Sequence, residues 1–259
     1  MSYAVVTGAS GGIGHAISLE LAKKGYDLVL VARSAEALNS LAAKVRNETG
    51  REAHVLVIDL SVPGSSDRVF EQSRAISEDI SVLVNNAGYG LLGAFDTLTL
   101  ESQMNMMQLN MVTMVQLSHL MLPLLKKQKA AYILNVASTA AYQAVPAMSV
   151  YAATKSFVLL FSRGLRYELK KSPVSVTVLS PGPTSTGFMN RAGMKEPWLV
   201  KRSEKYSMSA DQVARHAVKA LFKRKAEAIP GTLNAFAALM TGIAPKALTE
   251  KIAAGLYEK

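Results

Sequence analysis

The stretch Thr-Gly-Ala-Ser-Gly-Gly-Ile-Gly at residues 7–14 decides the fold, because it joins a strand-like run to a helical pattern. Residues 3–7 favour a β-strand, and residues 14–24 favour a helix ending near Gly25. The glycines permit a tight turn, let a phosphate group approach the backbone, and let the helix pack closely on the strand. Their spacing, G-xxx-G-x-G, differs from the common G-x-G-xx-G fingerprint. The position between strand and helix favours a dinucleotide site over a simple tight turn.

Downstream, short β-branched runs alternate with amphipathic helical stretches. Strands are expected at residues 27–31, 54–58, 81–84, 131–136, 174–179 and near 227–229, and helices at 35–49, 66–76, 101–127, 149–170 and 210–223. Such alternation implies right-handed crossovers and a parallel sheet with helices on both faces. We therefore predict the α/β class, with a single Rossmann-type, doubly wound domain over residues 1–259 and about seven strands.

Composition narrows the class of protein. The 259 residues are 49% hydrophobic and 19% charged, which suits one domain with a substantial core. The absence of cysteine excludes disulfides and thiolate chemistry, and the four scattered histidines do not have ligand spacing, so no metal site is predicted. Two uncharged stretches, 102–125 and 130–154, are long enough to span a membrane but contain polar side chains or Pro146. No secretory leader is recognisable, and we expect a cytoplasmic protein without a transmembrane segment.

The residues at the end of the second expected strand indicate which dinucleotide cofactor the chain prefers. A dinucleotide without a 2′-phosphate usually meets an acidic residue here, whereas this chain has Ala32 followed by Arg33. The guanidinium of Arg33 suits a phosphate dianion. The alternative is an ordinary solvent-facing arginine. We predict that NADP(H) is preferred over NAD(H).

Tyr151 and Lys155 stand four residues apart at the start of an expected helix, on one face of it. Free tyrosine has a pKa of about 10, and lowering it to about 7 takes roughly 4 kcal/mol of differential interaction, to which a nearby ammonium contributes. Ser138 follows the strand at 131–136, where its hydroxyl is placed to orient a carbonyl. Alone, such a Tyr-xxx-Lys pair is usually structural, so the accompanying motifs matter.

Those motifs, in their order and content, resemble the short-chain dehydrogenase/reductase superfamily of the classical type along nearly the whole chain. The matching segments are residues 7–14, Asp59-Leu60, Asn85-Asn86-Ala87-Gly88, and Pro181-Gly182 with Thr184 and Thr186. Asn110, Ser138, Tyr151 and Lys155 fall where the family has its catalytic tetrad.

The resemblance implies a role for each residue. Tyr151 is the acid or base, Lys155 lowers its pKa and binds the nicotinamide ribose, Ser138 stabilises the reacting oxygen, and Asn110 holds a water that links Lys155 to solvent. The implied cofactor contacts are Gly8, Ser10, Gly11, Gly12, Ile13, Gly14, Arg33, Asp59, Leu60, Asn86, Ala87, Gly88, Tyr151, Lys155, Pro181, Gly182, Thr184 and Thr186. Two departures are Gly11, where some NADP-dependent members have a basic residue, and Thr184, where valine is frequent.

Within the superfamily, the pattern is most similar to bacterial DltE-type reductases, with 3-ketoacyl-CoA reductases and hydroxysteroid dehydrogenases as more distant relatives. This resemblance implies reduction of a carbonyl, or oxidation of a secondary alcohol, on a hydrophobic substrate such as a 3-ketoacyl thioester or a steroid-like ketone. The alternative from another class is a non-catalytic NADP-binding regulator or membrane-surface scaffold, against which the intact tetrad argues. Dehydration or epimerisation of a nucleotide-linked substrate is disfavoured by the chain length.

The net charge of +10 lies in the second half, since residues 131–259 hold 18 Lys or Arg against 7 Asp or Glu. Residues 187–225 are the expected substrate-covering segment, and they contain ten basic residues: Arg191, Lys195, Lys201, Arg202, Lys205, Arg215, Lys219, Lys223, Arg224 and Lys225. A solvated face, an anionic carrier such as a coenzyme A or acyl-carrier thioester, and a membrane surface near Ala235–Pro245 remain open. Nucleic acid is disfavoured, because aromatic residues do not alternate with the basic ones.

Two further expectations concern apolar side chains. Phe188, Met189, Met194 and Trp198 are candidates either for the lining of a substrate pocket or for ordinary packing. Six methionines between residues 104 and 125 exceed what one helix buries on one sheet face. In the family, this helix and the tyrosine-bearing helix form a dimer interface, so we expect a homodimer or homotetramer, with a Met-rich core as the alternative.

Overall fold

The fold is described from a computed structural model, which covers residues 2–194, 196–198, 201 and 206–255. Seven parallel strands form the main sheet in the order β3-β2-β1-β4-β5-β6-β9. These strands are β1 (Tyr3–Thr7), β2 (Asp27–Ala32), β3 (Ala53–Val57), β4 (Ile80–Asn85), β5 (Ala131–Val136), β6 (Val174–Leu179) and β9 (Glu227–Ala228). The predicted Rossmann-type sheet is confirmed, and each expected strand lies within a residue or two of its observed bounds.

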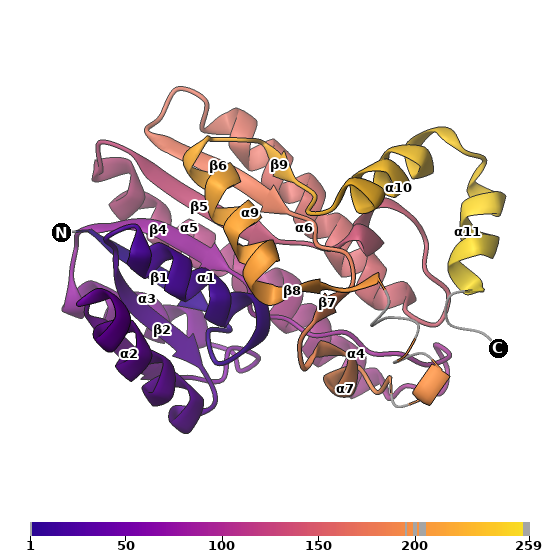
Figure 1. Cartoon of the computed structure of the whole chain (residues 1–259), viewed down its shortest axis with the longest axis horizontal. Helices are drawn as coiled ribbons and strands as arrows, with labels where there is room; N and C mark the ends of the chain where they lie inside the picture. The colour runs from indigo at the N-terminus through magenta and orange to yellow at the C-terminus, as the bar shows by residue number, and fades with distance from the viewer. Residues whose placement is uncertain (1, 195, 199–200, 202–205, 256–259) are drawn as a thin grey trace.

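Helices cover both faces of this sheet (Figure 1). One face packs against α1 (Gly12–Lys23), α2 (Ala35–Thr49) and α9 (Ala210–Phe222), and the other against α3 (Ser65–Ile76), α5 (Thr113–Lys127) and α6 (Ser149–Glu168). The central strands are therefore buried along their whole length, as their continuous runs of valine, leucine and isoleucine require.

The strand order locates the ligand-binding edge of the sheet. The chain passes from β1 outward to β2 and β3, then returns to the other side of β1 to form β4. The loops after β1 and β4 consequently leave the sheet in opposite directions and open a crevice at the carboxyl ends of the strands. The glycine-rich loop and the Asn86-Ala87-Gly88 segment both lie at this crevice.

Three features differ from the sequence prediction. The helix expected over 101–127 consists of α4 (Leu100–Met107), a five-residue π-helical segment η1 (Gln108–Val112) and α5, which contains Pro123. A short parallel pair, β7 (Thr184–Ser185) with β8 (Met208–Ser209), was not expected. Nor were the two C-terminal helices α10 (Thr232–Ile243) and α11 (Lys246–Ala254).

The long apolar stretches of the sequence do not form membrane-spanning helices in the part of the chain that the structure describes. Over the described ranges, no helix combines the length and the apolar character needed to cross a bilayer.

Candidate active site

The glycine-rich loop owes its shape to backbone conformation and to Asn86. Gly8 and Gly12 have φ angles of +66° and +56°, which side chains other than hydrogen rarely tolerate. A Cβ at Gly14 would lie 2.4 Å from the carbonyl oxygen of Gly8. The amide Nδ2 of Asn86 donates to the carbonyls of Thr7 and Gly8, at 3.0 and 3.2 Å. These hydrogen bonds fix the loop, and its glycines leave a space along the backbone that the side chain of a larger residue would fill.

A cavity of about 950 Å³ runs from this loop across the carboxyl ends of the strands. Of the residues predicted to contact a cofactor, all line this cavity except Gly14, which is used for packing of α1 on the loop. Of the predicted tetrad, Ser138, Tyr151 and Lys155 line it. Residues from distant parts of the sequence thus meet at one site.

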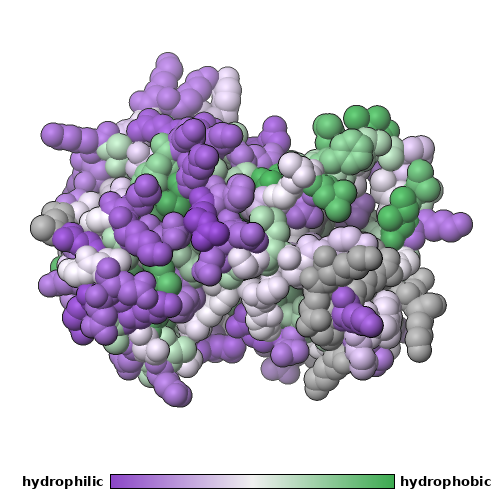
Figure 2. Space-filling view, in the orientation of Figure 1, coloured by the Kyte–Doolittle hydropathy of each residue, from purple (hydrophilic) through white to green (hydrophobic). Residues whose placement is uncertain are grey.

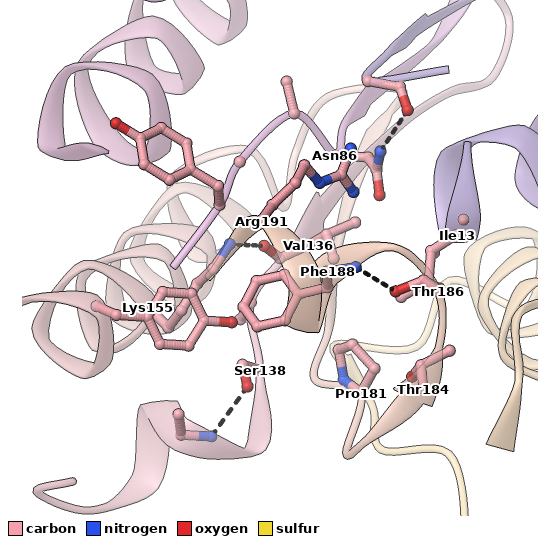
Figure 3. A pocket seen from close by; sticks show the side chains of 18 of the residues that line it. Ile13, Asn86, Val136, Ser138, Lys155, Pro181, Thr184, Thr186, Phe188 and Arg191 are labelled. Carbon is pink, nitrogen blue, oxygen red and sulfur yellow. Dashed lines mark hydrogen bonds between the residues drawn. The ribbon is translucent and has the colours of Figure 1, made fainter. Parts of the chain in front are cut away.

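Lys155 is the buried cation of the site. Its Nζ donates a 2.9 Å hydrogen bond to the carbonyl of Val136 at the end of β5, and it lies 5.8 Å from the centre of the Tyr151 ring (Figure 3). Burial lowers the pKa of Lys155 from 10.5 to about 8. The ammonium form therefore still predominates at neutral pH, in a setting with little water to screen it.

Tyr151 and Ser138 face the same cavity. Tyr151 is only 7% exposed, and its ring lies 5.5 Å from that of Phe188. Ser138 caps the short 3-10 helix η2 (Thr139–Tyr142), and its Oγ accepts a 3.1 Å hydrogen bond from the Ala140 N–H (Figure 3). This bond fixes the Ser138 side chain and occupies one lone pair of its oxygen. The hydroxyl hydrogen remains suited to donate a hydrogen bond to a ligand oxygen.

Asn110 lies behind the cavity wall, in the π-helical segment η1. Its Oδ1 accepts from the N–H of Tyr89 at 3.1 Å, and its Nδ2 donates to the Tyr89 carbonyl at 2.9 Å and to Thr154 Oγ1 at 3.1 Å. A Cβ on Gly88 would lie 2.8 Å from Asn110 Oδ1 and 3.4 Å from Lys155 Nζ. Gly88 therefore allows Asn110 and Lys155 to approach each other, and the local π-helix is of the kind that often marks functional sites.

Arg33 and Asp59 flank the far end of the cavity. Arg33 is 72% exposed in its side chain, and its Nη1 lies 3.8 Å from Asp59 Oδ2. Burial acts to raise the pKa of Asp59, but hydrogen bonds from Ser61 and the charge of Arg33 outweigh it and leave the pKa below its usual value. Arg33 is thus a solvent-accessible guanidinium at the cavity rim, and it forms a long ion pair with Asp59.

The segment after β6 closes the opposite wall. Thr184 Oγ1 donates to the Gly182 carbonyl at 2.9 Å, and Thr186 Oγ1 accepts from the Phe188 N–H at 3.2 Å. A Cβ on Gly182 would lie 2.5 Å from the side-chain amide of Asn234 on α10. This close approach places the start of α10 directly against the Pro181-Gly182 turn.

Sequence reasoning missed the contribution of the C-terminal helices to the site. The cavity is also lined by Asn234, Ala237, Ala238 and Thr241 of α10 and by Ala253 of α11. Of the proposed pocket residues, Phe188, Met189 and Met194 line the cavity, whereas Trp198 does not. From the basic segment, Arg191 is a lining residue (Figure 3). Lys195, Arg202 and Lys205 lie outside the described residues.

Acidic and histidine side chains are dispersed rather than clustered. In the part of the chain that the structure describes, no three His, Cys, Asp or Glu side chains gather in a way that could hold a metal ion.

Known proteins resemble this chain in sequence and in fold. Residues 2–197 match the family described as short chain dehydrogenase. Human 17-beta-hydroxysteroid dehydrogenase type 3 is 33% identical over 188 residues, covering 72% of this chain and 60% of that protein. The very-long-chain 3-oxoacyl-CoA reductase of Anas platyrhynchos is 36% identical over 186 residues, covering 70% and 59%. A short-chain dehydrogenase from Sphingobium yanoikuyae, solved in complex with NADPH, has a TM-score of 0.81 at 31% identity and covers 95% of this chain and 97% of that one.

The extent of the family match establishes that this chain belongs to the short-chain dehydrogenase family, as its motifs predicted. The chain spans about 60% of the length of the two sequence relatives named above.

Proposed function

We propose that this protein is an NADP(H)-dependent oxidoreductase that reduces a ketone or oxidises the corresponding secondary alcohol. The observation that carries this proposal is one continuous cavity with the glycine-rich loop and Arg33 at one end and Ser138, Tyr151 and Lys155 at the other. We further propose that residues 1–259 form a single domain, with residues 187–225 covering the substrate.

The cofactor end is suited to a dinucleotide. The cradle formed by Gly8, Gly12 and the first turn of α1 offers backbone N–H groups and a helix N-terminus to a pyrophosphate. The exposed guanidinium of Arg33 is suited to a 2′-phosphate, which would replace its long contact with Asp59. When bound, the nicotinamide group supplies or accepts the hydride.

The catalytic end is suited to acid–base work on an oxygen atom. Tyr151 transfers the proton to or from the substrate oxygen, and Ser138 donates a hydrogen bond to that oxygen. The buried Lys155 ammonium stabilises the Tyr151 phenolate through space, and its own position is set by the Val136 carbonyl. Asn110 hydrogen-bonds the Tyr89 backbone next to Gly88, which lies close to Lys155, and its proposed role is to hold a water that links Lys155 to solvent.

An apolar substrate suits the remaining wall of the cavity. Val145, Met148, Phe188, Met189 and Met194 form an apolar cluster that lines it. The named relatives act, by their names, on a hydroxysteroid and on a very-long-chain 3-oxoacyl-CoA. We propose a ketone carried on a hydrophobic body, such as a 3-ketoacyl thioester or a steroid-like ketone. Arg191 at the cavity is suited to an anionic carrier of such a ketone.

Assembly and location belong to the same proposal. Met106, Met114 and Met121 are buried in the core, while Met104 remains exposed on α4. Phe157 and Leu160 on α6 are exposed as well, and these apolar side chains support a homodimer or homotetramer through α4, α5 and α6. A cytoplasmic location stays a prediction.

The decisive experiment compares the purified protein with its Tyr151→Phe variant. We expect ketone reduction by NADPH to fall by about 10³-fold or more, because the proton donor is removed while the ring remains. Binding of NADPH, followed by fluorescence, should be retained. Undiminished turnover in the variant would contradict the role of Tyr151, and absence of turnover in the wild type with every ketone tested would favour a non-catalytic regulator.

A further inference from the structure

The two C-terminal helices have two different faces. On α10, the residues that line the cavity are Asn234, Ala237, Ala238 and Thr241. The large apolar residues that are exposed to solvent are Leu233, Phe236, Leu239, Met240 and Ile243. Positions 233, 236, 240 and 243 recur at the three- and four-residue spacing of one helix face. One face of α10 thus belongs to the active site and the other is a large apolar surface.

Helix α11 repeats this arrangement. Thr249 and Ala253, four residues apart, are buried, and Ala253 lines the cavity. Leu248 and Ile252, also four residues apart, are exposed. Among the described residues, seven exposed large apolar side chains therefore lie on these two consecutive helices, which we call the terminal apolar surface (Leu233, Phe236, Leu239, Met240, Ile243, Leu248 and Ile252).

The location of this surface is as informative as its composition. Helices α10 and α11 stand at the end of the molecule remote from α2 (Figure 1). In the space-filling view, the hydrophobic colour gathers over these helices, whereas the opposite end is mostly hydrophilic (Figure 2). A cluster of seven exposed large apolar side chains at one end of the molecule indicates an interaction site.

The charges around the surface indicate what kind of partner it meets. Residues 228–245 contain no charged side chain, and Lys246 and Lys251 follow immediately on α11 together with a single acid, Glu250. Interfacial helices in general immerse an apolar face between lipid chains and place lysines at the level of the head groups. The positive charge of these two lysines beside the apolar face complements the negative head groups of an anionic bilayer.

We propose that the terminal apolar surface binds peripherally to an anionic phospholipid bilayer, with α10 and α11 lying in the interface. The inner faces of the same helices line the cavity, so this contact brings the active site next to the lipid phase. The surface binds lipid whether or not the chain reduces ketones, and this inference therefore stands apart from the proposed function.

The test is co-sedimentation of the purified full chain with vesicles. One set is phosphatidylcholine mixed with phosphatidylglycerol, and the other is phosphatidylcholine alone. The key variant combines Leu239→Gln and Ile243→Gln, which change side chains that are 62% and 72% exposed and leave the charge unaltered. The matched control combines Val57→Gln and Val62→Gln, which remove two exposed aliphatic side chains near β3, at the opposite edge of the sheet.

We expect the wild type and the control to pellet with the anionic vesicles, and the Leu239→Gln, Ile243→Gln variant to partition at least about tenfold less. A Lys246→Gln, Lys251→Gln variant should lose binding to anionic vesicles and change little on phosphatidylcholine alone. Circular dichroism and NADPH binding should be the same in all variants, because each substituted side chain is exposed.

Three results would overturn the proposal. The first is a wild type that does not sediment with either vesicle. The second is equal partitioning of the apolar variant and the control. The third is a smaller oligomer, measured by light scattering, for the apolar variant alone with unchanged partitioning, which would assign the surface to a second copy of the chain.

Discussion

The two ends of the cavity are built in different ways. At the cofactor end, the walls are backbone and short side chains, held by buried contacts such as those of Asn86 with the Thr7 and Gly8 carbonyls. At the substrate end, the walls are side chains of α7 (Phe188–Arg191), α10 and α11, which belong to the segments that follow β6 and β9.

This difference follows from what each end has to bind. A dinucleotide has fixed dimensions and charged phosphates, so a rigid cradle of N–H groups and one guanidinium suffices. An apolar substrate needs adaptable apolar walls and a route of entry, for which methionines and a pair of exposed helices are suited. If the two ends are independent, a change at one end should leave ligand binding at the other end unaffected.

Replacing Lys155 should affect catalysis and stability in opposite directions. Since folding lowers the pKa of Lys155 from 10.5 to about 8, the unfolded chain binds this proton more tightly, and stability increases as the pH rises from 8 to 10.5. Lys155→Met removes the cost of burying the ammonium group, so at neutral pH the free energy of unfolding should rise by up to about 3 kcal/mol. Turnover should fall about 10³-fold or more. Urea unfolding at several pH values checks this.

The stability gain should shrink towards zero above pH 10.5, where the lysine is neutral in both the folded and the unfolded state. A difference in stability between variant and wild type that is the same at every pH would show that folding leaves the pKa of Lys155 unshifted.

Substituting Gly14 should damage the cofactor end as a whole. A methyl group there would lie 2.4 Å from both the Gly8 oxygen and Asn86 Nδ2, so the loop or α1 must shift. We expect Gly14→Ala to lower the free energy of unfolding by about 1–3 kcal/mol and to weaken NADPH binding. Gly11→Ala is the matched control for the free energy of unfolding, because a Cβ at Gly11 would have nothing within 4 Å of it. Equal behaviour of the two variants would argue against the packing role of Gly14.

Removing the Arg33 side chain should change cofactor choice alone. We expect Arg33→Ala to weaken NADPH binding about tenfold, or roughly 1.4 kcal/mol, and to leave NADH binding unchanged, because the exposed guanidinium is proposed to contact the cofactor at its 2′-phosphate. Parallel fluorescence titrations with both cofactors measure this, with Arg46→Ala on the exposed side of α2 as the control. Tighter binding of NADH than NADPH by the wild type would remove Arg33 as the phosphate-reading residue.

Narrowing the substrate end should leave the cofactor end intact. Ala237 is exposed yet lines the cavity, so Ala237→Leu reduces its width without disturbing the core. We expect the KM of a bulky ketone to rise several-fold, a change of about 1 kcal/mol, with the KM of a small ketone and the Kd of NADPH unchanged. An equal rise for large and small ketones would place α10 away from the substrate.

Local patterns in the sequence predicted the sheet, and together with the family resemblance they pointed to the proposed site residues. A strand, a glycine loop and a helix can be recognised as one unit from neighbouring residues, and a spacing of four residues puts Tyr151 and Lys155 on one face of any helix. The parallel topology followed from alternating periodicity, because crossovers between parallel strands are right-handed.

Only the tertiary structure decided the environment of these residues. The burial that lowers the pKa of Lys155, its bond to the Val136 carbonyl and the approach of Asn110 across Gly88 all join segments far apart in the chain. Helix α10 was missed because its large apolar residues lie on the exposed face and its polar residues Asn234 and Thr241 face the cavity, so periodicity would assign the wrong face to the interior. Local sequence specifies how a segment bends and pairs, whereas burial and charge at a site depend on what other segments bring to it.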